Sequence, residues 1–463
     1  MKIDCRLDYS TILANHGRPV HLSVALTAGE APAQARKRSM AFCVVLDRSG
    51  SMAGPPLNQA KAACETVVRN LRSEDEFALV AFDDHAKVVI PLQRICDKSA
   101  ALSAIREISD RGSTNLTAGW MLGQDELKKT SGDTARRVLL LSDGLLNVGI
   151  TDPEQVSRIV ADGLERGHIR TSTLGFGDQY DETLLERLAT SSGGNFYDAN
   201  SPEKLPAIFS AELEGLQKTA AQNVRLRVRK LTFCEDWQAL ASYYSVALPD
   251  GRTELSLGDL VSEESVTVIF QLEVLPLPLL PDGSPAASLE GEALMELEIL
   301  WDDLTGGEIK SCVHRQTVRI LATQNPADVK INVDVIPGVA VQRTGKAMEE
   351  ALREMQAGHS DQALAILREA VRQLQALGQE AQVAASVSRL EALIRQIEEN
   401  GTLDARSSKA LRFTSSHMRR SKSHSLWTID EQAPGYSQRS IPPPSSGKPP
   451  GDTPAKDQEE PPV

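Results

Sequence analysis

Apolar and amphipathic segments alternate between residue 39 and about residue 215. Continuous apolar runs such as AFCVVL and RVLLL are followed by stretches with helical periodicity, including NQAKAACETVVRNL and PEQVSRIVADGLERG. Strands that are apolar on both faces are typical of a parallel sheet that helices cover on both sides. The repeated order of strand and helix therefore predicts an α/β domain with a doubly wound, mostly parallel sheet.

The segments on either side of this domain have β character. Residues 3–28 predict two strands, and residues 220–325 contain the runs NVRLRVRKLTF, SVTVIFQLEVLPL and TVRILAT, separated by turn signals such as PDG. This pattern predicts an antiparallel β-sandwich. Two strands are too few to fold alone. We therefore expect the N-terminal strands to complete the sandwich, with the α/β domain inserted between them and the later strands.

The C-terminal third predicts helices and then a tail. Residues 338–400 contain three amphipathic segments that end on Gly or Asn-Gly, which is compatible with a tetratricopeptide-like hairpin or a plain bundle. From residue 403 a basic, Ser/Thr-rich stretch and then a proline-rich stretch predict disorder. The predicted parts are 1–38 (sandwich strands), 39–218 (α/β domain), 219–330 (rest of the sandwich), 338–402 (helical domain) and 403–463 (disordered tail).

Composition narrows the classes of partner and compartment. The net charge of −13 and the aromatic content of 4% argue against nucleic acid or an anionic membrane as the main partner. No apolar run approaches the ~20 residues that a membrane span needs, and the first residues contain no apolar signal core. The six cysteines form no CxxC pair, so we expect free thiols and a cytoplasmic protein.

Oxygen-bearing side chains gather where predicted strands end. Asp47 closes the run AFCVVLD and is followed by Ser49 and Ser51, whereas Thr114 lies in RGSTNL and Asp143 closes LLLSD. Ligands of doubly wound sheets bind beyond the carboxyl ends of the strands, so these five should meet at one edge. Carboxylates and hydroxyls without His or Cys suit Mg²⁺, Mn²⁺ or Ca²⁺ rather than zinc. Such a set leaves room for water or an external carboxylate.

The motif DRSGS, with Thr114 and Asp143 in later loops, resembles the metal-ion-dependent adhesion site (MIDAS) of von Willebrand factor type A (VWA) domains. The resemblance implies that Ser49, Ser51 and Thr114 bind a divalent cation directly, with Mg²⁺ foremost. It implies that Asp47 and Asp143 often act through water, and that an Asp or Glu of a protein partner completes the metal shell.

The whole layout resembles bacterial cytosolic VWA proteins that are often labelled calcium-activated chloride channel homologues. Some proteins of this kind are linked to signalling modules. By analogy, the resemblance implies Ser/Thr kinase, phosphatase or AAA+ components as partners.

We therefore expect a metal-dependent protein–protein interaction scaffold, with no catalytic residues and no enzymatic activity. A second hypothesis is an adaptor whose basic tail recruits the partner when phosphorylated. Its candidate phosphosites are Thr414, Ser415, Ser416, Ser421 and Ser423. A third hypothesis is a metal-dependent phosphohydrolase. A haloacid dehalogenase-type nucleophile at Asp47 would need a second Asp two residues later, where Ser49 stands.

Overall fold

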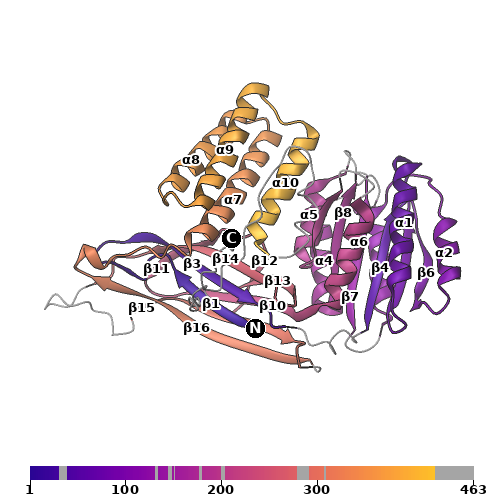
Figure 1. Ribbon diagram of the computed structural model, residues 1–463, viewed down its shortest axis with the longest axis horizontal. Coiled ribbons are helices and arrows are strands. Elements are labelled where there is room, and N and C mark those ends of the chain that lie inside the picture. The colour runs from indigo at the N-terminus through magenta and orange to yellow at the C-terminus, as the bar shows by residue number, and fades with distance from the viewer. Residues whose placement is uncertain are drawn as a thin grey trace, which may run out of the picture. The chain divides into compact units, whose positions relative to one another are not determined.

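The computed structural model describes residues 1–30, 39–130, 134–143, 149–150, 152–176, 180–199, 204–278, 291–306 and 309–422. Its elements form an α/β domain, a β-sandwich and a helical region (Figure 1). None of the helices within these ranges is long and apolar enough to cross a membrane. All six cysteines lie within the same ranges as free thiols, as expected.

The α/β domain is built on a six-stranded sheet in the order β6-β5-β4-β7-β8-β9. All neighbouring strands pair in parallel except β5 and β6. Every residue of β4 is buried, which explains its continuous apolar sequence. The strands are β4 (Met40–Asp47), β5 (Glu76–Phe82), β6 (Ala86–Arg94), β7 (Ala135–Ser142), β8 (Ile169–Phe176) and β9 (Phe196–Ala199).

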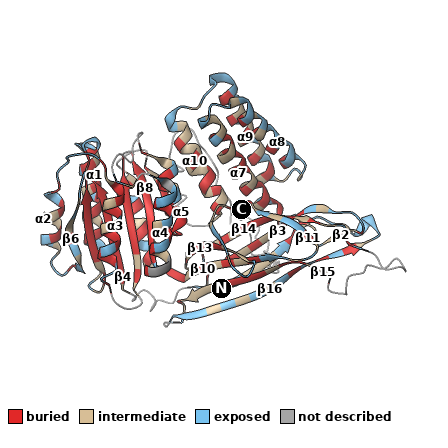
Figure 2. Ribbon diagram, turned by 180° about the vertical axis from the view of Figure 1, so that it is seen from behind, coloured by how far each residue is buried: buried red, intermediate tan, exposed pale blue. Residues whose placement is uncertain are grey.

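Helices cover both faces of this sheet (Figures 1 and 2). Alternate residues of β4 and β5 pack on buried side chains of α3, α4 and α5 in one core. Helices α1 and α6 pack against each other. The helices are α1 (Pro55–Asn70), α2 (Lys98–Arg106), α3 (Leu116–Leu127), α4 (Pro153–Gly167), α5 (Glu182–Ser191) and α6 (Leu205–Gln217), with a short 3₁₀ turn, η2 (Gly50–Met52). This arrangement confirms the predicted doubly wound sheet.

The β-sandwich uses strands from both sides of the α/β domain. One sheet has the order β1-β3-β14-β11 and the other β12-β13-β10-β15-β16-β2. The strands are β1 (Lys2–Leu7), β2 (Thr11–Leu13), β3 (Arg18–Thr27), β10 (Thr219–Lys230), β11 (Cys234–Ala239), β12 (Tyr244–Ala247), β13 (Thr253–Val261), β14 (Ser265–Val274), β15 (Glu292–Asp303) and β16 (Lys310–Thr323). Because β3 pairs antiparallel with β14 along its whole length, the predicted insertion is confirmed.

The helical region contains α7 (Ile336–Gln356), α8 (Ser360–Gln375) and α9 (Ala381–Asn400), preceded by a 3₁₀ turn, η4 (Pro326–Asp328). A fourth helix, α10 (Ala405–Arg420), lies where the sequence predicts disorder, so that prediction is wrong for these residues. Lys409 and Arg412 are buried because they pair with Glu182 at 3.1 Å and Glu186 at 3.3 Å on α5. Residues 423–463, the rest of the predicted tail, lie outside the described residues.

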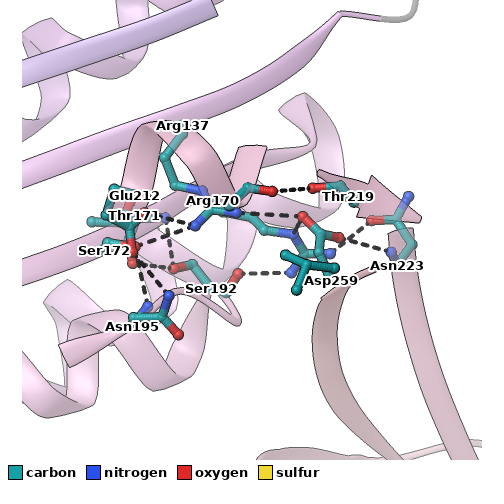
Figure 3. A network of polar contacts seen from close by, with 12 residues as sticks. Arg137, Arg170, Thr171, Ser172, Ser192, Asn195, Glu212, Thr219, Asn223 and Asp259 are labelled. Atoms are coloured by element: carbon teal, nitrogen blue, oxygen red, sulfur yellow. Dashed lines mark hydrogen bonds and ion pairs between the residues drawn. The ribbon is translucent and has the colours of Figure 1, made fainter. Parts of the chain in front are cut away.

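Charged side chains also join the α/β domain to the sandwich (Figure 3). Arg170 on β8 lies 2.8 Å from Asp259 on β13. Arg137 on β7 pairs with Glu212 on α6 at 2.8 Å and lies 3.5 Å from Asp259. Both arginines are near the amino ends of their strands. This junction therefore lies at the sheet edge opposite Asp47, which ends β4.

Candidate metal centre

The loop after β4 is fixed by Asp47, whose side chain is fully buried. One carboxylate oxygen, Oδ1, accepts a hydrogen bond from the backbone N–H of Ser49 at 2.9 Å. The other, Oδ2, accepts from the Ser142 hydroxyl at 2.7 Å. The first bond turns the chain directly after the strand. The second ties this turn to the end of the neighbouring strand β7.

Two serine hydroxyls link this turn to Asp143. The Ser51 hydroxyl donates to Oδ1 of Asp143 at 2.9 Å. The Ser49 and Ser51 oxygens lie 3.1 Å apart, and since the Ser51 hydrogen is already used, Ser49 donates in that contact. Ser49 and Asp143 are buried, whereas Ser51 is exposed. Four of the five residues predicted from the sequence are thus brought together, and the group opens to solvent at Ser51.

Thr114, the fifth residue, is buried at 3% exposure in the loop before α3. Among the described contacts its hydroxyl makes no hydrogen bond to the other four. Its loop is nevertheless attached to theirs. The Gly50 N–H donates to the carbonyl of Gly112 at 3.2 Å, and the Arg111 N–H donates to the carbonyl of Arg48 at 2.9 Å. Thr114 therefore follows directly on a segment that is bonded to the serine loop.

Asp83 holds these two loops together. Its Oδ2 lies 2.6 Å from the Arg48 guanidinium and 3.0 Å from that of Arg111. Its carbonyl accepts from the N–H of Asn115, the N-cap of α3, at 2.8 Å. Burial alone raises the pKa of Asp83, but the His85 N–H and the two guanidinium groups bring that pKa below its usual value. Sequence reasoning missed this role; the only signal was the acidic pair after β5.

Gly112 is required where the two loops meet. Its φ is +73°, in the left-handed region, and a Cβ there would lie 2.9 Å from a carboxylate oxygen of Asp84. The Asp84 carboxylate in turn accepts from the backbone N–H of Ser113. The close approach of Asp84 to the backbone therefore depends on glycine at this position.

The two carboxylates of the centre lack a neutralising cation among the described side chains that contact them. Burial raises the pKa of Asp47, and burial followed by the charge of Asp47 raises that of Asp143 to about 6. A bound divalent cation would favour the ionised form of both. No group of three or more His, Cys, Asp and Glu side chains suited to a metal occurs in the described ranges. The centre instead combines two carboxylates with hydroxyls, a donor set that fits a hard cation.

The candidate phosphosites lie on or after α10. Ser415 and Ser416 are buried, at 1% and 3% exposure, and Thr414 is half-buried. The Ser421 hydroxyl donates to the Met418 carbonyl at 2.8 Å and accepts from the Gln342 side chain at 3.1 Å. Ser423 lies outside the described residues. A kinase could reach the two buried serines only after α10 had left its position.

Comparison with known proteins points to one domain family. The model of the von Willebrand factor type A domain matches residues 42–211. Uncharacterized protein sll0103 of Synechocystis is 26% identical over 358 residues, which cover 74% of this chain and 79% of that protein. Uncharacterized protein YfbK of Escherichia coli is 26% identical, and the matched region covers 57% of this chain and 48% of the length of YfbK. Inter-alpha-trypsin inhibitor heavy chain H1 of Sus scrofa is 29% identical, and the matched region covers 41% of this chain and 22% of the length of the heavy chain. The chain thus spans less than half the length of the last two.

Two solved structures share the fold over most of the chain. A von Willebrand factor type A protein from Catenulispora acidiphila has a TM-score of 0.67 at 18% identity and covers 89% of this chain and 96% of its own. The ArnB paralogue VWA2 from Sulfolobus acidocaldarius has a TM-score of 0.57 at 15% identity, covering 90% and 98%. At these identities the likeness concerns the fold alone.

Proposed function

Since residues 42–211 form a von Willebrand factor type A domain, a module commonly used to bind proteins, we propose that this chain binds a protein partner through a divalent cation, with Mg²⁺ foremost. The bound ion would be held by Asp47, Ser49, Ser51, Thr114 and Asp143. It would supply a positive centre that accepts an oxygen ligand from outside the chain.

One observation carries this proposal. Asp47 and Asp143 are both buried, the charge of Asp47 raises the pKa of Asp143, and Ser51, whose hydroxyl donates to Asp143, is an exposed residue. A cation would compensate both carboxylates from the side on which Ser51 meets solvent. A partner that offers Asp or Glu there would pair its own charge with the ion.

In this arrangement the rest of the chain has a positioning role. Asp83, with Arg48 and Arg111, keeps the serine loop against the loop of Thr114. Both loops are anchored to buried elements, β4 and α3, which would hold the proposed ligands in place before a partner arrives. By analogy with the bacterial VWA proteins that the layout resembles, we propose a scaffold in bacterial signalling that acts in the cytoplasm.

The test captures partners from a lysate of the source organism on immobilised protein. Wild type, Asp143→Asn and Asp110→Asn are compared in Mg²⁺ and in EDTA. Asp110 is exposed in the loop before Thr114, so its variant controls for the loss of one charge. We expect a set of proteins that only wild type and Asp110→Asn retain, and only in Mg²⁺. Equal capture in EDTA would contradict the metal dependence, and equal capture by Asp143→Asn would contradict the site.

A further inference from the structure

A cavity of about 440 Å³ lies between helices α7 and α8 and strands β11 and β14. None of its lining residues belongs to the metal centre. Three alanines, Ala347, Ala365 and Ala370, leave the space open, and Leu240 and Ile366 give it apolar surface. The volume is within the range of small-molecule sites in proteins.

Arg343 of α7 carries its charge into this cavity without a carboxylate partner. Its Nη1 donates to Oε1 of Gln373 at 3.1 Å. Its Nη2 donates to Oε1 of Gln271 and to Nε2 of His21, both at 2.9 Å. Within the described ranges, no Asp or Glu oxygen lies at ion-pair distance from its guanidinium. A half-buried cation whose direct partners are neutral is costly. The charge of Asp8, behind His21, offsets part of that cost, and an anion in the cavity would offset more.

His21 and Asp8 hold this arginine in one orientation. The Nδ1 of His21 lies 2.7 Å from Oδ2 of Asp8, and the backbone N–H of His21 donates to Oδ1 of Asp8 at 2.7 Å. Since Arg343 can only donate, Nε2 of His21 is the acceptor, and the ring hydrogen lies on Nδ1 and points to Asp8. This leaves the Nε–H and one Nη1 hydrogen of Arg343 without an acceptor among the described residues.

A second cation lines the same cavity. Lys346, one turn along α7, donates to Oε1 of Gln238 at 2.6 Å and lies 3.9 Å from Glu350. Glu369, on the α8 side, is bonded to Arg372 and accepts from Gln373 at 2.9 Å. The two glutamates disfavour an anion with several charges. Arg343 and Lys346 favour one with a single charge.

We propose that this cavity binds a small organic monocarboxylate. Its carboxylate pairs with Arg343 and Lys346, and its apolar part covers Leu240 and Ile366. The free Nε–H of Arg343 and the ammonium of Lys346 supply charge-assisted hydrogen bonds to the carboxylate. The site is separate from the metal centre, and neither proposal depends on the other.

Calorimetric titration of the full chain in EDTA tests this site. The probes are benzoate and 3-methylbutanoate, with succinate and inorganic phosphate as anions of higher charge. The variants are Arg343→Gln, which removes the charge, and Ala365→Phe, which fills the cavity from an exposed position on α8. Arg353→Gln is the matched control, because Arg353 is an exposed arginine of α7 outside the cavity.

We expect a monocarboxylate to saturate wild type and Arg353→Gln, with affinity lowered at least about tenfold in Arg343→Gln and lost in Ala365→Phe. The proposal is overturned if no monocarboxylate binds in the millimolar range, if phosphate binds more tightly, or if Arg343→Gln binds as wild type does. Should Arg343→Gln fail to fold, Ala365→Phe decides: undiminished binding there refutes the site.

Discussion

Replacing Asp143 with asparagine should change the stability of the protein in opposite directions with and without metal. In the metal-free protein Asp143 is 7% exposed, and burial together with the charge of Asp47 raises its pKa from 3.8 to about 6. This difference corresponds to at most about 3 kcal/mol of destabilisation at neutral pH. The variant loses that cost and keeps a polar group near Ser51. We expect it to be more stable in EDTA by about 1–3 kcal/mol.

The sign of the pH dependence follows from the raised pKa of Asp143. An acid whose pKa is higher in the folded state stabilises the fold at pH values below its unfolded pKa, and this contribution is lost as the pH rises through the folded value. Metal-free wild type should therefore lose stability between about pH 4 and pH 6. The Asp143→Asn variant should show a flatter profile over that window.

Mg²⁺ should reverse the order of stability. Ligand binding to the folded state stabilises wild type in proportion to the logarithm of the Mg²⁺ concentration, whereas Asp143→Asn has lost a ligand. The assay is thermal unfolding in EDTA and in excess Mg²⁺, where 1 kcal/mol corresponds to roughly 2–4 °C for a domain of this size. Asp110→Asn, with an exposed side chain, is the control. The reasoning fails if Mg²⁺ stabilises the variant as much as wild type, or if the variant is less stable in EDTA.

Three further predictions concern other parts of the chain. Gly112→Ala should cost about 1–2 kcal/mol of stability and lower the Mg²⁺ affinity measured by calorimetry, because the new Cβ displaces Asp84. Gly251→Ala is the control: Gly251 also has a positive φ but faces open space, so this variant should keep the Mg²⁺ affinity of wild type. Burial lowers the pKa of Lys422 to about 8, so stability should rise between about pH 8 and 10.5 in urea unfolding, and Lys422→Met should remove that rise. Lys409→Met should lower stability by about 1.5–3 kcal/mol, since the bonds of Lys409 to the Tyr180 carbonyl and to Glu182 on α5 are lost. A variant as stable as wild type would show that these contacts of α10 do not stabilise the α/β domain.

The sheet and its carboxyl edge could be predicted because they depend on local pattern. A strand that is buried on both faces, such as β4, has to be apolar whatever packs on it, and Asp47 stands out at its end. The sequence therefore predicts the positions of Asp47 at the end of β4 and of Asp143 directly after β7. The attachment of Thr114 through Gly50 and Gly112 could not be predicted, because it depends on backbone contacts between loops far apart in the sequence.

Helix α10 shows why composition gave a wrong prediction of disorder for residues 405–420. A basic, Ser-rich stretch is soluble by itself, and its burial requires carboxylates from elsewhere. Lys409 finds Glu182, which is 227 positions away in the sequence. The same applies to Arg343, whose neutral partners come from three elements. A sequence pattern identifies apolar residues that must be buried. It does not identify charged residues that become buried because partners from distant parts of the sequence pair with them.

The insertion of the α/β domain sets the order in which this protein can fold during synthesis. The hydroxyls of Thr27 and Ser265, at one end of the β3–β14 ladder, lie 2.7 Å apart but 238 positions apart in the sequence. At ribosomal rates of about 5–20 residues per second, roughly 12–50 s separate the synthesis of the two strands. During that interval Val20, Leu22 and Val24, which are fully buried in the folded protein, lack the neighbouring strand β14. The sandwich therefore closes only after the α/β domain has been synthesised, and until then β3 is a point at which nascent chains can aggregate and chaperones can bind.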